Sequence, residues 1–475
     1  MCGIIGLIKK TGDAIYDALV LLSAENNRGE QACGVAAFDG RIIRRYCGLG
    51  KVSEVFGQRD QKKWSKLVGS AVIGHDLYST NDPAARNGPQ SKTMHPLFFN
   101  FHGRRGAIGH NGNLVRLDGL RSRAERAGYN FRSKISDTEV IVAMLSTAPE
   151  KDFLEALVRI SRELEDKGAF SLVILFRGKL IGIRCGIRPL CIGKKIGRSG
   201  DSDSYILASE SCVFPALEAT RFLREVAPGE LVMLGPGGYE RSIKWGTRKR
   251  PGFCVYEFLY SARPASCFFG VSVSDFRYRA GQMSARKHPV RADVIVPIPN
   301  SGRHYSDGFS SESKIPTREA IEKSHYDIRN RSFMEEREVN RGETQRRRLQ
   351  VIRSAMDGKS VCGTEDTVFR ASVAPMVVRM AREHGNAREF HLRICSPPAC
   401  FTCHLGLDTS TKEELVASNM TVEEIRDRII HSDSLEYLTI EELREVIRWL
   451  GLDPDDFCLG CFTGEYPVDP PAKKQ

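Results

Sequence analysis

A segment rich in glycine, proline and basic residues divides this 475-residue chain near its middle. It spans residues 236–252 and reads PGGYERSIKWGTRKRPG, a composition typical of the connection between two compact units. At roughly 150 residues per domain, a chain of this length holds about two or three domains. We therefore expect an N-terminal domain over residues 2–238 and a C-terminal domain over residues 253–475.

The two halves differ in the pattern of their apolar residues. The N-terminal half contains short apolar runs bounded by glycine and charged residues, such as residues 2–8 and 169–176, which predict buried strands. Residues 152–164 have helical spacing, so we expect layers of sheet and helix there. In the C-terminal half, a strand over residues 360–364 leads through a loop into a helix over residues 375–384, which is the unit of a parallel sheet.

Two further segments of the C-terminal half carry local signals. Capping boxes, in which glutamate follows threonine by three residues, predict helix starts at Thr411, Thr421 and Thr439. Residues 329–353 contain eight arginines and few apolar residues, which favours a solvated segment. A loop that covers bound phosphate is the alternative.

The composition excludes several classes of protein. The hydrophobic and charged fractions, 41% and 27%, are those of a globular chain. No apolar run approaches the ~18 residues of a membrane span, and the apolar start is too short for a secretory signal. We therefore expect a cytoplasmic protein whose 14 cysteines are thiols or metal ligands. The net charge of +11 favours anionic partners, and because we find no nucleic-acid-binding module, phosphorylated metabolites suit it better.

Cys2 follows the initiator methionine, and its small side chain permits removal of Met1. The product would carry an α-amino group that titrates near ~7.7–8.0 beside a thiol that titrates near ~8.5, so the amine could take the thiol proton. Cys2 is thus a candidate nucleophile with its own base. On this feature alone, a simply buried cysteine is the more common explanation.

Further motifs follow Cys2 in a fixed order. They are RGEQACG (28–34), GHDLYST (74–80), HNGNL (110–114) and SDTE (136–139). This set resembles the glutaminase domain of amidotransferases with an N-terminal nucleophile. Later motifs narrow the resemblance to the amidophosphoribosyltransferase family and extend it to the end of the chain. They are GIRPL (186–190), ASES (208–211), PGE (228–230), SARP (261–264), IPNSG (298–302), SPP (396–398) and CFTGEYP (461–467).

The resemblance implies a fold of mixed α/β and α+β class. A four-layer αββα glutaminase domain would be followed by a type I phosphoribosyltransferase domain with a parallel sheet. The implied reaction transfers glutamine-derived ammonia to phosphoribosyl pyrophosphate with Mg²⁺, which gives 5-phosphoribosylamine in the first step of de novo purine synthesis. Members of the family are commonly homo-oligomers that respond to nucleotides, so we expect both properties here.

The resemblance also assigns roles in the glutaminase site. The Cys2 thiolate would attack glutamine, the Asn111 side chain and the Gly112 backbone N–H would hold the oxyanion, and Asp137 would bind the α-ammonium group. By itself, Asn-Gly is more often a tight hairpin turn. The arginine with which the family binds the glutamine α-carboxylate is Leu77 here, a loss of about 1.5–3 kcal/mol unless another cation compensates. Arg28 is the candidate substitute.

For phosphoribosyl pyrophosphate and Mg²⁺, the resemblance implies five binding residues: Ser301, Glu365, Asp366, Thr367 and Ser372. The surrounding motifs depart from the family pattern at several positions. Asn300 and Glu365 each replace an aspartate, Ala371 replaces a glycine and Val373 replaces a threonine. A plain acidic turn before a helix is the alternative interpretation of this segment.

A CxxC motif lies near the C-terminus, at Cys458 and Cys461. Alone it is compatible with a redox pair, half of a zinc site or part of a cluster. One subgroup of the family carries a [4Fe-4S] cluster on four cysteines, which match Cys254, Cys403, Cys458 and Cys461. Zinc on the same quartet and four ordinary thiols are the alternatives.

The departures from the family pattern motivate two rival functions. One is a paralogue that kept the fold but lost or changed catalysis and serves in regulation or assembly. The other is a glutaminase that delivers ammonia to a different phosphorylated acceptor. Leu77, Asn300, Ala371 and Val373 motivate the first alternative. The second would explain an altered phosphoribosyl site beside an intact Cys2, Asn111 and Asp137.

Overall fold

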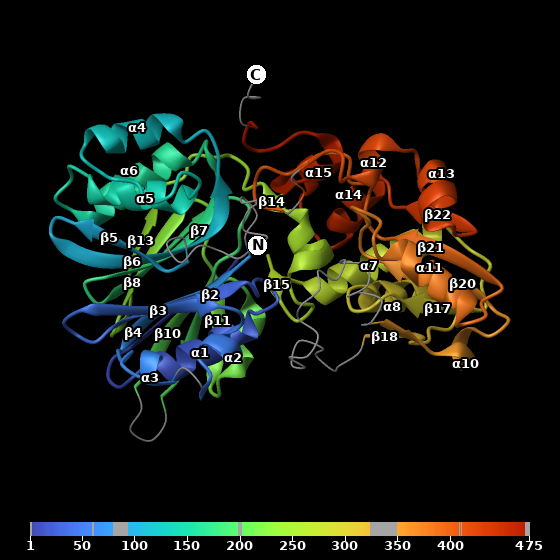
Figure 1. The fold of residues 1–475 in the computed structure, drawn as a ribbon, viewed down its shortest axis with the longest axis horizontal. Helices are drawn as coiled ribbons and strands as arrows, with labels where there is room; N and C mark the ends of the chain where they lie inside the picture. Colours follow the sequence, from blue (N-terminus) through green and yellow to red (C-terminus); the bar gives the residue numbers. More distant parts are fainter. Residues whose placement is uncertain are drawn as a thin grey trace, which may run out of the picture.

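The computed structural model describes residues 2–58, 61–78, 94–197, 202–323, 349–407, 409 and 411–470. Two units lie side by side, the first built from the N-terminal half and the second from the C-terminal half (Figure 1). Most of the arginine-rich segment, residues 329–348, lies outside the described residues. None of the helices in the described ranges has the length and apolar character needed to cross a bilayer.

The N-terminal unit contains two stacked antiparallel sheets. The seven-stranded sheet has the order β11-β9-β10-β1-β4-β2-β3. Its strands are β1 Gly3–Lys9, β2 Ala32–Phe38, β3 Ile43–Leu49, β4 Ala71–Leu77, β9 Cys191–Lys195, β10 Ser204–Ala208 and β11 Thr220–Glu225. The six-stranded sheet has the order β13-β12-β8-β7-β6-β5. Its strands are β5 Leu97–Phe101, β6 Arg104–Leu114, β7 Gly168–Phe176, β8 Lys179–Cys185, β12 Glu230–Gly235 and β13 Gly238–Lys244.

Helices cover the outer faces of both sheets, which gives four layers (Figure 1). On the seven-stranded sheet they are α1 Ile15–Ala24, α2 Val52–Val55, α3 Gln61–Trp64 and the 3-10 helix Ser211–Ala216. On the six-stranded sheet they are α4 Asp118–Arg126, α5 Asp137–Ser146 and α6 Phe153–Leu164. The predicted αββα arrangement is thus confirmed.

Burial on both faces explains why the central strands are continuous apolar runs. In β1, Ile4 packs between the two sheets against residues such as Val173, whereas Ile5 packs beneath α1 with Leu21. A strand with two buried faces needs no polar alternation. The apolar run that predicted this strand therefore reflects its place in the middle of the layers.

The C-terminal unit is built on a four-stranded parallel sheet of order β17-β20-β21-β22, as the strand–loop–helix pattern predicted. The strands are β17 Val294–Pro297, β20 Ser360–Glu365, β21 Glu389–Ile394 and β22 Ser434–Tyr437. The helices are α7 Val273–Lys287, α8 Gly302–Ser313, α10 Arg353–Met356, α11 Ala374–Glu383, α12 Val416–Asn419, α13 Val422–Glu424, α14 Ile440–Trp449, α15 Gly460–Thr463, the π-helical segments Glu257–Ser261 and Ile425–Ile430 and the 3-10 turn Pro454–Asp456. Three two-stranded pairs complete the unit: β14 Phe253–Cys254 with β23 Phe457–Cys458, β15 Cys267–Phe268 with β16 Val271–Ser272, and β18 Ile321–Lys323 with β19 Leu349–Val351.

Two of the three predicted helix starts are confirmed. Thr421 and Thr439 form reciprocal capping boxes at α13 and α14. The prediction at Thr411 is wrong, because the next helix, α12, begins only at Val416. The physical reason is that the Glu414 carboxylate, which a capping box at Thr411 would need, forms an ion pair with Arg370 at 2.7 Å.

The connection between the units is shorter than its composition suggests. Residues 238–244 of the glycine- and basic-rich segment form the edge strand β13, which pairs with β12. Trp245, directly after the strand, is buried in the core of the N-terminal unit. The exposed polar residues of an edge strand gave this segment its linker-like composition.

Candidate active sites

Cys2 lies immediately before β1 and is half-buried. The Arg28 Nε donates to the Cys2 carbonyl oxygen at 3.0 Å, and the Ile4 N–H donates to the Ser209 hydroxyl at 2.9 Å. The Cys2 thiol itself lies 3.6 Å from the Tyr78 carbonyl oxygen. The backbone around the thiol is therefore held from both sides.

His75, in β4, sets the ionisation of this thiol. Burial raises the pKa of Cys2, but the electrostatic influence of His75 outweighs it and lowers that pKa to about 7. The His75 Nε2 lies 2.9 Å from the His110 carbonyl oxygen, which ties β4 to β6 in the opposite sheet. His75 stands in the GHDLYST motif, but no local pattern predicts its contact with β6.

Asn111 and Gly112 lie inside β6, opposite Ser171 and Phe170 of β7, so they do not form a hairpin turn. The Asn111 side chain is 1% exposed, and neither its nitrogen nor its oxygen has a hydrogen-bond partner among the described residues. A buried amide without partners is costly, so this group is available to a ligand. At Gly112, a Cβ atom would lie 2.2 Å from the Ala169 carbonyl oxygen, so only glycine fits.

Asp137 is the first residue of α5, beside the end of β6. Its Oδ2 accepts from the Leu114 N–H at 3.1 Å, and its Oδ1 accepts from the Thr138 N–H at 2.7 Å. The His110 ring nitrogen Nδ1 lies 3.8 Å from the same carboxylate. These contacts fix the carboxylate near the strand that carries Asn111.

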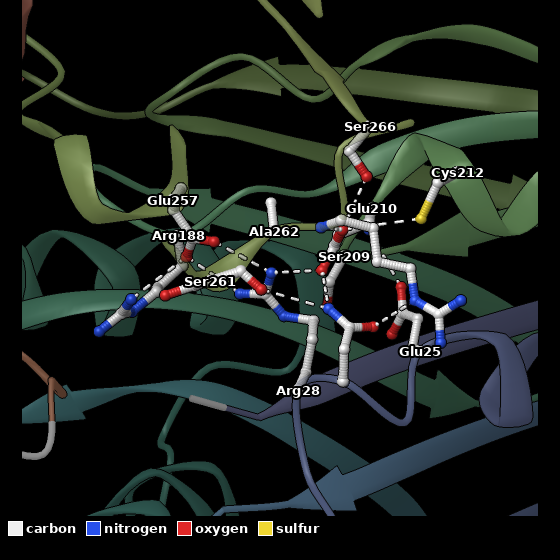
Figure 2. A network of polar contacts seen from close by, with 12 residues as sticks. Glu25, Arg28, Arg188, Ser209, Glu210, Cys212, Glu257, Ser261, Ala262 and Ser266 are labelled. Carbon is white, nitrogen blue, oxygen red and sulfur yellow. Dashed lines mark hydrogen bonds and ion pairs between the residues drawn. The ribbon is translucent and has the colours of Figure 1, made fainter. Parts of the chain in front are cut away.

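Arg28 does not serve as the substitute for the missing arginine. Its guanidinium is buried and pairs with Glu210 at 2.9 Å and with Glu257 at 3.0 Å, while its Nε binds the Cys2 carbonyl (Figure 2). Each of its three nitrogens donates to a partner within the protein, so it is poorly placed to bind a glutamine carboxylate. The expectation that Arg28 binds glutamine is therefore corrected: it holds the backbone of Cys2.

The contacts of Arg28 belong to a buried network between the two units (Figure 2). Glu257, from the C-terminal unit, also pairs with Arg188 at 3.2 Å, and Arg188 donates to the Leu405 carbonyl oxygen at 2.7 Å. Burial alone would favour a neutral Glu257, but the charges and hydrogen bonds of Arg28 and Arg188 keep the pKa of Glu257 below its usual value. The network connects the Cys2 backbone to the loop that contains Cys403.

In the C-terminal unit, Glu365 and Asp366 lie at the carboxyl end of β20, beside the start of α8. Ser301 donates to the Glu365 carboxylate at 3.1 Å, so the structure brings these three predicted residues together. Burial raises the pKa of Asp366 to about 6, and burial together with Asp366 raises that of Glu365 well above the usual value. The Asp366 Oδ2 is buried without a partner among the described residues. Carboxylate oxygens placed in this way suit a hard cation such as Mg²⁺.

The loop after Asp366 leads into α11 and carries the other two predicted residues. The Thr367 hydroxyl lies 3.4 Å from the Tyr256 hydroxyl, whereas Ser372 is exposed. Ala371 has a positive φ of 48°, a backbone conformation that glycine adopts without steric cost. The chain thus keeps the glycine-type turn that the family pattern specifies, although the residue has a side chain. Asn300, on the facing loop, is exposed.

The four cysteines of the predicted quartet come from three distant segments. Cys254 and Cys458 are opposite each other in the parallel pair β14 and β23, and Cys461 lies in α15. Cys403 accepts from the Leu405 N–H at 3.4 Å. All four are free thiols.

Electrostatics show that these thiols are neighbours. Negative charge on Cys403, Cys254 or Cys458 raises the pKa of Cys461. The pKa of Cys403 falls to about 6, mainly through a hydrogen bond from Cys461 and despite burial. Within the described ranges, no three His, Cys, Asp or Glu side chains lie close enough to share one metal ion.

Comparison with known proteins places the whole chain. No family model matches it. It is 35% identical to an amidophosphoribosyltransferase of Archaeoglobus fulgidus over 479 residues, 100% of this chain and 99% of the relative. It is 36% identical to the amidophosphoribosyltransferase of Pyrococcus horikoshii over 98% of this chain and 96% of the relative. It is 33% identical to the chloroplastic amidophosphoribosyltransferase of Glycine max over 99% of this chain and 78% of the relative.

Solved structures agree with this result. The glutamine phosphoribosylpyrophosphate amidotransferase of B. subtilis, complexed with ADP and GMP, is 31% identical with a TM-score of 0.86 over 100% of this chain and 99% of its own. A structure described as the allosteric regulatory enzyme of purine biosynthesis is 30% identical with a TM-score of 0.88 over 100% and 98%. With this similarity in sequence and structure along its entire length, the chain belongs to the amidophosphoribosyltransferase family.

Proposed function

We propose that this protein is a cytoplasmic, glutamine-dependent amidophosphoribosyltransferase that makes 5-phosphoribosylamine from glutamine and phosphoribosyl pyrophosphate for purine synthesis. The observation that carries this proposal is the buried amide of Asn111, which has no partner among the described residues and lies on β6, a strand that packs against β1 at whose start Cys2 stands. A thiol nucleophile and an unused amide donor are the requirements for acyl transfer from an amide. The two substrates, glutamine and phosphoribosyl pyrophosphate, are inferred from membership of the family.

The glutaminase half-reaction uses four residues of the N-terminal unit. The Cys2 thiolate attacks the glutamine carboxamide carbon, and the oxyanion that forms accepts hydrogen bonds from the Asn111 amide and the Gly112 N–H. Each such donor typically contributes about 3 kcal/mol to the transition state. Asp137 binds the α-ammonium group. Ammonia leaves, and water hydrolyses the thioester.

The synthetase half-reaction uses the C-terminal unit. Ser301, Glu365, Asp366, Thr367 and Ser372 would bind phosphoribosyl pyrophosphate, and the buried Asp366 oxygen without a partner suits Mg²⁺. When bound, Mg²⁺ neutralises the charge of the leaving pyrophosphate. The two acids orient the ribose and the metal, while the loop that carries Thr367 and Ser372 receives the 5-phosphate at the start of α11.

Cys254, Cys403, Cys458 and Cys461 would hold a [4Fe-4S] cluster. When bound, the cluster ties the start of the C-terminal unit to its end, which is a stabilising role. The protein should then contain iron and sulfide in anaerobic preparations, and Cys403→Ser should remove both. Cys400→Ser is the matched control, because the Cys400 thiol donates to the backbone carbonyls of Pro398 and Ala417 and lies outside the quartet. Zinc in place of iron would contradict the cluster.

The function is tested with anaerobic protein, phosphoribosyl pyrophosphate and Mg²⁺. Pyrophosphate release is followed with glutamine or with ammonium as the nitrogen source, and glutamate is measured in parallel. We expect release with both, and we expect Cys2→Ser to abolish only the glutamine-dependent rate. Formation of glutamate without release of pyrophosphate would indicate another acceptor. Absence of both products with either nitrogen source would indicate a non-catalytic paralogue.

Regulation and assembly are part of the same proposal. The B. subtilis relative was solved with ADP and GMP, which suggests purine nucleotides as effectors here. Addition of GMP and ADP should lower the rate of pyrophosphate release. Size-exclusion chromatography with light scattering should show a homo-oligomer, and a monomer would contradict that part of the proposal.

A further inference from the structure

The backbone of Cys2 is held at a point where the strand has not yet begun. β1 pairs with β4 from Gly3 onward and with β10 from Ile5 onward, so Cys2 precedes the paired residues. Its carbonyl oxygen accepts a hydrogen bond from the Arg28 Nε at 3.0 Å. The position of the proposed nucleophile therefore depends on where the Arg28 guanidinium is held.

Glu257 holds this guanidinium with both of its carboxylate oxygens. The Oε2 accepts from the Arg28 Nη1 at 3.0 Å, and the Oε1 accepts from the Arg28 Nη2 at 3.0 Å (Figure 2). Both side chains are buried, and a bidentate pair of this kind sets the plane of the guanidinium as well as its distance. The third nitrogen, Nε, is then directed at the Cys2 carbonyl oxygen. Glu257 is the first residue of the π-helical segment Glu257–Ser261, which belongs to the C-terminal unit.

The second acid that binds Arg28 is also attached to the C-terminal unit. The Oε1 of Glu210 accepts from the Arg28 Nη1 at 2.9 Å. The Oε2 of Glu210 accepts from the Arg263 N–H at 2.8 Å and from the Ser266 hydroxyl at 2.7 Å. Contacts with the C-terminal unit therefore orient Arg28 twice, directly through Glu257 and indirectly through Glu210.

We infer that Glu257 is a positioning residue for the glutaminase reaction: it orients Arg28, and Arg28 fixes the backbone of Cys2. In this arrangement the C-terminal unit completes the active site of the N-terminal unit. The inference rests on the proposed glutaminase function and deepens it, because a residue of the synthetase unit then controls the rate of the other half-reaction. If Glu257 only joined the two units, its loss would lower stability without a specific effect on glutamine hydrolysis.

The test is glutamine hydrolysis by Glu257→Gln. The new side chain has the shape of glutamate, but its amide nitrogen is a donor, so only one of the two bonds to Arg28 can form. We expect kcat to fall by about 10- to 100-fold, because a misplacement of about 1 Å can cost about 10²-fold in rate. KM should change by less than about threefold, since the proposed contacts of the substrate with Asp137 and Asn111 remain. Ammonium-dependent pyrophosphate release should be retained.

Glu230→Gln is the matched control, because Glu230 is a buried glutamate that forms a bidentate pair of the same kind. Its Oε1 and Oε2 accept from the Nη2 and Nη1 of Arg224 at 2.7 and 2.8 Å. Arg224 lies on the edge strand β11, which β9 and β10 separate from β1. This variant removes a glutamate–arginine pair without touching Arg28, so the kcat of glutamine hydrolysis should stay near its original value.

A second substitution shows whether Glu257 acts through Arg28. Arg28→Lys keeps the positive charge, but one nitrogen cannot bond to Cys2 and also form a bidentate pair with Glu257. In the Arg28→Lys protein, Glu257→Gln should lower kcat further by less than about twofold, because both substitutions break the same connection. If Glu257→Gln lowers kcat by the same factor with and without Arg28→Lys, Glu257 acts by another route and the inference is wrong.

Hydrogen exchange reads the same connection without catalysis. Mass spectrometry of the peptide that contains residues 2–8 measures how often the start of β1 opens. In Glu257→Gln this peptide should exchange at least about fivefold faster than in the unmutated protein, because local opening sets the exchange rate. In Glu230→Gln its exchange should be unchanged.

An active unmutated protein whose kcat does not respond to Glu257→Gln would overturn the inference and leave the proposed function in place. An equal fall of the glutamine-dependent and ammonium-dependent rates would also overturn it. If the unmutated protein hydrolyses no glutamine while exchange of residues 2–8 depends on Glu257, the proposed function is wrong and the connection to Cys2 is retained. If Glu257→Gln does not fold, Glu257→Asp serves in its place, because its carboxylate keeps the charge but ends one methylene short of Arg28.

Discussion

In the N-terminal unit the candidate catalytic atoms lie on or next to strands, whereas in the C-terminal unit several lie on a loop. Cys2 and Asn111 adjoin β1 and occupy β6, and the bond from Arg28 and the pairing of β6 with β7 hold their backbones. Thr367 and Ser372 lie between β20 and α11, and Ser372 is exposed. A site on paired strands is ordered before substrate arrives, while a loop site gains order from its ligand.

The two sites also differ in their unsatisfied groups. Among the residues proposed to act in the first site, the unpartnered atoms belong to the neutral Asn111 amide. In the second, the unpartnered atom belongs to an acid, Asp366, next to Glu365. A neutral site can remain empty at moderate cost, but adjacent buried acids need protons or a cation. The second site should therefore respond much more strongly to pH and Mg²⁺.

The largest effect is expected at Asn111. Asn111→Ala removes an oxyanion donor that rigid strands hold in place, so kcat for glutamine hydrolysis should fall by about 10²- to 10³-fold. Asn100→Ala, on the exposed face of β5, is the matched control and should have no effect. Ammonium-dependent pyrophosphate release should be the same in both variants. An unchanged rate of glutamine hydrolysis in Asn111→Ala would show that Asn111 is not an oxyanion donor.

The next effect is expected at the end of β4. Leu77→Arg supplies a cation where the family pattern has one, at a half-buried position. The KM for glutamine should fall by about 10- to 100-fold, the equivalent of one charge-assisted hydrogen bond. Leu77→Met, which has a long side chain without charge, should leave KM near its original value. An equal fall of KM in both variants would show that the effect comes from packing and not from charge.

A smaller effect is expected at the acid pair. The raised pKa of Asp366, about 6, means that the folded protein binds a proton more tightly than the unfolded chain. The free energy of unfolding should therefore fall as pH rises from about 4 to 6, and stay low above that. Asp366→Asn should stabilise the Mg²⁺-free protein by about 2 kcal/mol at pH 7.5 and hardly at all at pH 4.

Urea unfolding at the two pH values measures this difference. Mg²⁺ should stabilise the original protein at pH 7.5 and have little effect on Asp366→Asn, because the cation binds the ionised acid. Equal stability of the two proteins at pH 7.5 would show that the acid pair is compensated in another way.

The smallest effect is expected at Ala371. Its positive φ of 48° is unfavourable for a residue with a side chain, so Ala371→Gly should raise the free energy of unfolding by about 1 kcal/mol. Ala374→Gly, a few residues on at the start of α11, is the matched control. There the same change should destabilise by about 0.5–1 kcal/mol, because the backbone is helical. Thermal unfolding of both variants tests whether the first change raises the free energy of unfolding and the second lowers it.

How much the sequence predicts depends on how far apart the interacting residues are. The strands and α11 could be predicted, because their burial and capping leave local patterns. At Asn111 the local turn signal was misleading, since pairing with Ser171 of β7 keeps the chain extended. Thr411 failed for the same kind of reason, because Glu414 pairs with a residue far away in the sequence.

The candidate site shows the same limit. The resemblance identified Cys2 and Asn111, but no local pattern shows that the His75 ring reaches the His110 carbonyl oxygen of β6 in the opposite sheet. Nor could the sequence show that Arg28 is occupied by Glu210 and Glu257, which lie some distance along the chain. Roles that depend on packing between strands and between units are visible only in three dimensions.

The charges at the contact of the two units limit how this chain can be taken apart. Arg28 and Arg188 come from one unit, and Glu257, which pairs with both, comes from the other. Removing one partner of such a buried pair typically costs about 3–5 kcal/mol. A chimera that joins this N-terminal unit to the C-terminal unit of a relative should therefore be viable only if the relative supplies a carboxylate at the position of Glu257. In a truncated hydrolase made from the first unit alone, both arginines would lose Glu257, and Arg28 would keep its ion pair with Glu210.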